Sequence, residues 1–249
     1  MELPTGLITI LRKAKKIVVL TGAGMSAESG VPTFRDAQTG LWARLRPEEL
    51  ATPEAFRDHP QIVWDWYEER RENIRKVRPH AGHYALVEME KYFESMLMVT
   101  QNVDGLHQLA GSPEVIELHG NLMRSVCSET GKLIEDEWIR SNPGRPPASP
   151  HHPMGLARPG VVWFGEPLPE GSMSRAMQAV YESDVCFSIG TSALVQPAAS
   201  LPLIAVNAGA VFIEINPAPT PLSSMAEFSL QLAAAEALTA ISAGLARCK

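Results

Sequence analysis

The sequence predicts an α/β fold in which a doubly wound, mostly parallel sheet is joined by a second, smaller lobe. Apolar runs of strand length recur along the chain, and they are continuous rather than alternating in polarity. Continuous runs are typical of strands that are buried on both faces of a parallel sheet. Amphipathic helical patterns lie between several of these runs, which favours strand–helix–strand units and a Rossmann-like main domain.

The first expected element is a short amphipathic helix, because Leu7, Ile10 and Leu11 share one helical face. A buried strand, Ile17 to Leu20, follows it. Later strands are expected in the apolar runs 97–100, 115–118, 161–164, 185–189 and 210–215.

Two of the intervening helices show a clear apolar face with helical spacing. The positions that form these faces are Leu86, Met89, Phe93 and Leu97 in the first helix, and Leu238, Ile241 and Leu245 in the last.

Two stretches interrupt the alternation and are expected to form the second lobe. Residues 40–80 are rich in Trp and helical in pattern, and residues 141–160 hold six prolines and three glycines and are expected to be loop throughout. The expected main domain therefore comprises residues 1–39, 81–121 and 160–249. The expected small lobe comprises residues 40–80 and 122–159.

The composition excludes several classes of protein. Lys and Arg number 22 and Asp and Glu 28, so the formal net charge is −6, and neither nucleic acid nor a membrane surface is an expected partner. No apolar run reaches the ~20 residues of a membrane-spanning helix. The cysteines Cys127, Cys186 and Cys248 are too few and scattered for a disulfide framework, so a cytoplasmic protein is expected.

The first strand runs into a glycine-rich turn in the string IVVLTGAG (17–24). Gly22 and Gly24 would let the backbone approach a pyrophosphate, and a helix N-terminus behind them would supply N–H donors. Because the next glycine is Gly30, the spacing is not G-x-G-x-x-G, and a plain tight turn is the alternative.

Longer strings in a fixed order along the chain are more specific. They are GAGMSAESGVPTFRD (22–36), TQNVDGLH (100–107), LHGNL (118–122), VVWFGE (161–166), GTSALVQPA (190–198) and IN (215–216). Together they resemble the sirtuin family, the NAD-dependent protein-lysine deacylases. The resemblance implies that the main domain binds NAD as co-substrate and that acylated lysine side chains of proteins are the substrates.

The resemblance also assigns roles to single residues. For NAD it implies a pyrophosphate and ribose cradle, a mobile loop over the nicotinamide ribose, a polar pocket lining, and phosphate and adenosine contacts. The cradle residues are Gly22, Ala23, Gly24 and Glu28, and the mobile-loop residues are Phe34, Arg35 and Asp36. The pocket is lined by Gln101, Asn102 and Asp104. The phosphate and adenosine contacts are Gly190, Thr191, Ser192, Asn216 and Ala234. Asn102 and Asp104 are also implied in catalysis. The acylated peptide is expected to pair as an added strand with the backbone of Val162, Phe164, Gly165 and Glu166.

His119 matches the general base of the family, and its position agrees with that role. It follows the expected strand 115–118, at the sheet edge where α/β proteins bind ligands. Deacylation needs a ribose hydroxyl to be deprotonated, and a histidine with a pKa near ~6.5 suits that step at neutral pH. The alternative is a histidine that only forms a hydrogen bond at a strand end.

Tyr67 and Arg70 predict the acyl group. In a helix they are i, i+3 neighbours, and a phenol beside a guanidinium can bind the distal carboxylate of an acidic acyl chain. This Tyr-x-x-Arg pair, with ATPEAF (51–56), resembles the class III sirtuins, which remove succinyl, malonyl or glutaryl groups. The alternative is a solvated helical face within the charge run 68–72.

The sequence departs from most sirtuins at their structural zinc site, which two C-x-x-C pairs hold. Cys127 lacks its partner, because Thr130 stands there, and the second pair is replaced by Pro150, His151, His152 and Pro153. We expect no metal, with Cys127 plus His151 or His152 as the alternative zinc ligands. The small lobe would then be held by packing around Leu133, Ile134, Trp138 and Ile139.

The leading prediction is therefore a deacylase that removes succinyl or malonyl groups, and acetyl groups as well, and yields nicotinamide and 2′-O-acyl-ADP-ribose. The alternatives are a plain deacetylase, a mono-ADP-ribosyltransferase, or a non-catalytic protein that senses NAD. The joint presence of Asn102, Asp104 and His119 favours catalysis.

Overall fold

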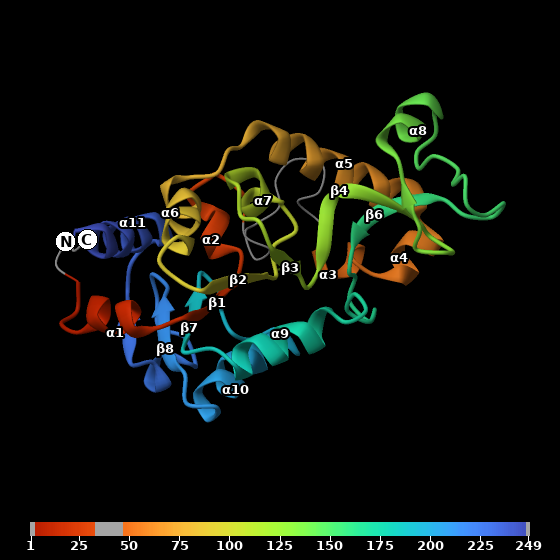
Figure 1. Cartoon of the computed structure of the whole chain (residues 1–249). Helices are drawn as coiled ribbons and strands as arrows, with labels where there is room; N and C mark the ends of the chain where they lie inside the picture. The colour runs from red at the N-terminus through yellow and green to blue at the C-terminus, as the bar shows by residue number, and fades with distance from the viewer. Residues whose placement is uncertain (1–2, 33–46, 248–249) are drawn as a thin grey trace.

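The computed structural model describes residues 3–32 and 47–247, and these form two sheets with their helices (Figure 1). The main sheet has six strands in the order β3-β2-β1-β7-β8-β9, and all neighbouring pairs are parallel. Its strands are β1 (Lys16–Thr21), β2 (Ser95–Thr100), β3 (Val115–Glu117), β7 (Val185–Ile189), β8 (Val211–Ile215) and β9 (Phe228–Leu230). This arrangement confirms the predicted doubly wound sheet.

Helices cover both faces of the main sheet. One face carries α1 (Leu7–Lys13), α6 (Ala81–Glu90) and α11 (Ala234–Ala246), whose apolar side chains pack with Ile17 and Val19 of β1. The other carries α9 (Ser172–Tyr181) and α10 (Leu201–Asn207), which pack with Val18 and Leu20. Alternate residues of β1 therefore enter two separate cores, which explains why the whole strand is apolar.

The second sheet is antiparallel, with the order β5-β4-β6, and it lies beside the main sheet (Figure 1). Its strands are β4 (Gly120–Cys127), β5 (Leu133–Ile134) and β6 (Ala157–Val161). The helices α3 (Pro47–Leu50), α4 (Pro53–Asp58) and α5 (Pro60–Lys76) belong to this part of the molecule, and Trp66 and Tyr67 of α5 share a core with Leu122 and Val161. The short helix α8 (Asp136–Ser141) lies at the outer tip.

The remaining short elements lie around the carboxyl edge of the main sheet and its connections. They are α2 (Gly24–Ala27), α7 (Leu106–Ala110) and the 3-10 turns η2 (Ala198–Ser200) and η3 (Ser223–Met225). No helix within the described ranges is long and apolar enough to cross a membrane.

The strand expected at 161–164 was predicted wrongly. Only Val161 belongs to a strand, and that strand is β6 of the antiparallel sheet. The Val162 N–H still follows the register of this antiparallel pair, because it donates to the His119 carbonyl at 2.9 Å, and the Phe164 N–H then donates to the Ala51 carbonyl at 2.9 Å, away from the parallel sheet. The continuous apolar run 161–164 thus indicates that Val161 and Trp163 are buried, but it does not indicate a strand of the parallel sheet.

Three further expectations need correction. The stretch 141–160 is not loop throughout, since 157–160 lie in β6, an edge strand in which Pro159 is tolerated. The helical pattern around 86–97 ends earlier, because α6 stops at Glu90 and Leu97 lies in β2, packed on the opposite core. In the small sheet Ile134 is buried, but Leu133 and Trp138 are 50% and 37% exposed, so they do not form its core.

The predictions for Phe34, Arg35, Asp36 and Trp42 lie outside the described residues.

Candidate active site

Three glycines bring the loops after β1 and β7 into direct contact. The Gly24 N–H donates to the Gly190 carbonyl at 2.8 Å, and the Gly22 N–H donates to the Ile189 carbonyl at 3.0 Å. A Cβ atom on Gly24 would lie 2.8 Å from the Cα atom of Gly190, and one on Gly22 would lie 2.8 Å from the Cβ atom of Thr191. Side chains therefore cannot occupy these positions, and backbone forms the surface where α/β proteins bind nucleotides. Ala23 begins the adjoining turn as the N-cap of α2.

The polar residues predicted at the end of β2 face this cradle. The Asn102 amide nitrogen donates to the Gly22 carbonyl at 3.0 Å and to the Ser26 hydroxyl at 3.1 Å. The Gln101 amide donates to the Thr191 hydroxyl at 3.3 Å. The structure thus brings together residues 22–26, 101–102 and 190–191, which are far apart in the sequence.

Asp104 is a buried carboxyl group in the same loop. Burial raises its pKa, and hydrogen bonds from the Leu106 N–H and the Ser26 hydroxyl oppose that rise. The Leu106 N–H donates to Asp104 Oδ1 at 2.9 Å, so Asp104 holds the start of α7 and approaches Ser26.

His119 lies just beyond β3, as predicted. Its Nδ1 atom is 3.0 Å from the carbonyl oxygen of Gln101. Because a carbonyl only accepts hydrogen bonds, Nδ1 carries the hydrogen and Nε2 is the basic nitrogen. Burial lowers the pKa of His119, and the hydrogen bond to Gln101 partly offsets this. The imidazole is therefore neutral at pH 7 and can accept a proton.

A buried polar chain lies behind the site, and its two threonines, Thr21 and Thr100, were not predicted as part of the site. His107 Nε2 lies 3.0 Å from the Thr21 hydroxyl, which lies 2.8 Å from the Thr100 hydroxyl. The Thr100 oxygen in turn accepts the Asn102 N–H at 3.0 Å. Burial lowers the pKa of His107 to about 4, so the ring is neutral. The signal in the sequence was a threonine at the carboxyl end of each of two buried strands.

Hydrogen bonds hold Glu28, which is implied in the cradle, and Asn216, which is implied at the adenosine end. Glu28 accepts the N–H of Ala235 at 2.8 Å, so it caps α11, of which Ala234 is the buried first residue. The Asn216 amide donates to the Ala218 carbonyl at 2.6 Å. Ser192 follows Thr191 in the turn after β7.

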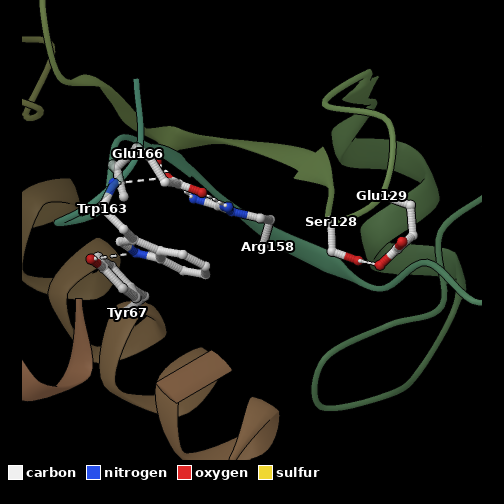
Figure 2. A network of polar contacts seen from close by, with 7 residues as sticks. Tyr67, Ser128, Glu129, Arg158, Trp163 and Glu166 are labelled. Atoms are coloured by element: carbon white, nitrogen blue, oxygen red, sulfur yellow. Dashed lines mark hydrogen bonds and ion pairs between the residues drawn. The ribbon is translucent and has the colours of Figure 1, made fainter. Parts of the chain in front are cut away.

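Tyr67 and Arg70 lie on one side of α5, and the solvated-face interpretation does not fit them. Tyr67 is 5% exposed, and its hydroxyl accepts the indole N–H of Trp163 at 2.9 Å (Figure 2). The Arg70 guanidinium lies over the ring of Trp66, 5.0 Å from the centroid. Burial raises the pKa of Tyr67 to about 12 and lowers the pKa of Arg70. Among the residues that the structure describes, no Asp or Glu forms an ion pair with Arg70.

The segment 161–166 connects this pocket to His119. The Val162 N–H donates to the His119 carbonyl, and Phe164, which is 49% exposed, lies beside the left-handed Gly165 at φ +88°. The Glu166 side chain is held in place, because its carboxylate accepts two hydrogen bonds from the Arg158 guanidinium and one from the backbone N–H of Trp163 (Figure 2).

The residues at the zinc position do not fit a metal. The Cys127 thiol is buried, which raises its pKa, but hydrogen bonds from Ser149, Thr130 and two backbone N–H groups outweigh burial and lower the pKa overall. His151 Nε2 hydrogen-bonds to the Leu133 carbonyl, and His152 Nδ1 accepts the Met154 N–H. Within residues 3–32 and 47–247, no three His, Cys, Asp or Glu side chains form a group that could hold a metal ion.

Comparisons with known proteins agree with this geometry. The Sir2 family model matches residues 22–197. An NAD-dependent protein deacylase of Thermus thermophilus is 49% identical over 232 residues, covering 92% of this chain and 89% of that protein. One of Aquifex aeolicus is 51% identical over 211 residues, covering 85% and 87%.

Solved structures give the same result. A Sir2 homologue–NAD complex superposes with a TM-score of 0.89 at 45% identity, covering 98% of this chain and 94% of that chain. A Sir2–p53 peptide–NAD+ complex has a TM-score of 0.84 at 28% identity, covering 96% and 97%. A family match that spans more than half of the chain shows membership: this chain belongs to the Sir2 family.

Proposed function

We propose that this chain is an NAD-dependent protein-lysine deacylase that removes succinyl and malonyl groups and also acts on acetyl groups. NAD is the co-substrate, and the glycine cradle fits it, because the backbone of Gly22, Gly24 and Gly190 leaves no side chain in the way. When bound, NAD supplies an electrophilic ribose carbon to the acyl-lysine amide oxygen and releases nicotinamide. The acyl group leaves as 2′-O-acyl-ADP-ribose.

In this proposal His119 acts as the general base through Nε2. The Gln101 carbonyl holds the ring in the tautomer with a free Nε2, and burial keeps it neutral. Asn102 and Asp104 line the nicotinamide-ribose end, and their contacts with Gly22 and Ser26 hold them beside the cradle. The backbone of 162–166 would bind the substrate peptide as an added strand.

The observation that supports an acidic acyl group is the environment of Arg70. Arg70 is half-buried, its guanidinium lies over the ring of Trp66, and it has no carboxylate partner among the described residues. A partly desolvated cation without a counter-ion is unfavourable, and a carboxylate on the substrate would relieve that cost. The phenol of Tyr67 lies beside it as a second donor, and an acetyl group offers no charge for either residue to bind.

The experiment compares succinyl-lysine and acetyl-lysine versions of one peptide with the wild type and Arg70→Met. The variant should lower kcat/KM for the succinyl peptide by roughly 10- to 150-fold, the loss of one charge-assisted hydrogen bond, and should lower it much less for the acetyl peptide. Arg75→Met, which alters an exposed arginine on the same helix, serves as the matched control.

The other outcomes identify the alternatives. Equal losses on both peptides would make this enzyme a plain deacetylase. Release of nicotinamide without loss of either acyl group would indicate ADP-ribosyl transfer. Binding of NAD with no nicotinamide release from any peptide would indicate a non-catalytic sensor.

A further inference from the structure

The Tyr67 hydroxyl is oriented by a residue from a distant part of the chain. Trp163 is 2% exposed, and its Nε1 atom lies 2.9 Å from the Tyr67 oxygen (Figure 2). An indole N–H is only a donor, so the phenol oxygen must be the acceptor. The Tyr67 hydrogen therefore points away from the indole, and no described residue accepts it.

The group that would share a ligand with this hydroxyl is the Arg70 guanidinium. Tyr67 and Arg70 are i, i+3 neighbours on α5 and are close enough for the guanidinium to act electrostatically on the phenol. A carboxylate bound to Arg70 would thus lie beside a phenol whose oxygen already accepts the indole N–H and whose hydrogen is left for the ligand. If the Tyr67 hydroxyl is oriented before the acyl chain binds, binding does not have to carry the entropy cost of ordering it.

The indole itself is held on several sides. The Arg158 guanidinium lies over its ring at 3.4 Å from the centroid, and the Phe56 ring lies 5.3 Å away. Arg158 donates to both oxygens of the Glu166 carboxylate, at 2.5 and 2.8 Å, and the same carboxylate accepts the backbone N–H of Trp163 at 2.8 Å. Figure 2 shows Arg158, Glu166 and Trp163 as one group above the Tyr67 side chain.

We propose that Trp163 is a specificity-determining positioning residue, whose indole N–H turns the Tyr67 hydroxyl toward the distal carboxylate of the acyl chain. The Arg158–Glu166 pair fixes the indole in that position. The inference rests on the proposed preference for acidic acyl groups, and it adds the residue that prepares the phenol for them. A tryptophan at this place then favours carboxylate-bearing acyl chains, and a phenylalanine would not.

The test is a double-mutant cycle with Trp163→Phe, which keeps a ring on Phe56 and Arg158 but removes the N–H. The readout is the ratio of kcat/KM for succinyl-lysine and acetyl-lysine peptides in the wild type, Trp163→Phe, Tyr67→Phe and the double variant. Trp163→Phe should lower this ratio about 3- to 10-fold, mainly through KM for the succinyl peptide, as the loss of one neutral hydrogen bond predicts. In the Tyr67→Phe background it should lower the ratio no further, because the hydroxyl it orients is absent.

An unchanged ratio, or equal effects of Trp163→Phe with and without the Tyr67 hydroxyl, would overturn the inference. Arg70→Met separates this failure from failure of the proposed function. If Arg70→Met lowers the ratio and Trp163→Phe does not, only the role of Trp163 is wrong; if neither does, acidic acyl recognition itself is wrong. Should Trp163→Phe not fold, site-specific incorporation of 3-benzothienylalanine keeps the shape of the indole and removes only its N–H.

Discussion

His119 illustrates how a single backbone contact decides the chemistry of a side chain. The strand-end position was visible in the sequence, but the contact of Nδ1 with the Gln101 carbonyl determines which nitrogen is basic. Burial then lowers the pKa of His119, which favours the neutral form of the ring. A base that is already neutral needs no activating partner.

We predict that His119→Ala lowers the deacylation rate by about 10²–10⁴-fold, the usual contribution of a general base. Binding of NAD should change little, because the histidine acts after nicotinamide has left. Turnover with saturating NAD and acyl peptide, with NAD affinity measured separately by calorimetry, tests both parts. A variant that kept a third of the wild-type rate would show that another group is the base.

The pH profile of the wild type provides the control for this assignment. Since the pKa of His119 is lowered, kcat should fall only below about pH 6.5, as acid protonates the base. An acidic limb with its midpoint above pH 7 would contradict the neutral buried imidazole.

At the scale of elements, α5 connects the acyl pocket to the small sheet. Tyr67 and Arg70 serve the pocket, whereas the adjacent Arg71 is 4% exposed and binds β4. Its guanidinium donates to the carbonyls of Leu122 and Arg124, both at 2.7 Å, and to the Ser125 hydroxyl at 3.1 Å. One arginine in the charge run is thus a buried crosslink between a helix and a strand.

We predict that Arg71→Met lowers the free energy of unfolding by about 3–5 kcal/mol, because it removes the donor from buried carbonyls and leaves Glu68 without its ion-pair partner. Urea unfolding followed by circular dichroism measures this loss. Arg75→Met, which removes an exposed guanidinium one turn further along, should cost less than about 0.5 kcal/mol. Similar costs for both variants would mean that the Arg71 contacts add nothing to stability.

At the scale of the whole molecule, the small sheet packs around a small core of buried side chains. Its core contains Trp64, Cys127, Ile134 and Ala157, with hydrogen bonds around the Cys127 thiol where ligands would otherwise meet. Arg71 and a network of hydroxyl and N–H donors add polar contacts to this core, in which Ile134 is the only buried member of the packing expected from the sequence.

We predict that the purified protein contains less than about 0.1 zinc per chain and that a chelator leaves its melting temperature unchanged, since a structural zinc contributes directly to folding. Elemental analysis and thermal unfolding with and without chelator provide the measurements. One zinc per chain, with a lower melting temperature after chelation, would instead indicate Cys127 with His151 or His152 as ligands.

The sequence by itself determined five of the six strands of the main sheet, β9 being missed, and the positions of the cradle and His119. These features depend on local patterns: continuous apolar runs for strands buried on both faces, glycines at the ends of strands, and a histidine directly after a strand. The carboxyl ends of parallel strands meet at one edge, so residues such as Gly22, Asn102 and His119 are brought together once the strand order is correct.

The tertiary structure alone decided the second sheet and the partners of its buried polar groups. β4 pairs with β6 across a proline-rich stretch that local propensity assigns to loop, and Trp163 reaches Tyr67 from 96 residues away. Arg71 meets its acceptors on β4 at a separation of 51 to 54 residues, and Glu28 caps a helix 207 residues further along the chain. Such contacts leave no periodic signal, because they depend on how separate elements pack against one another rather than on the conformation of any one of them.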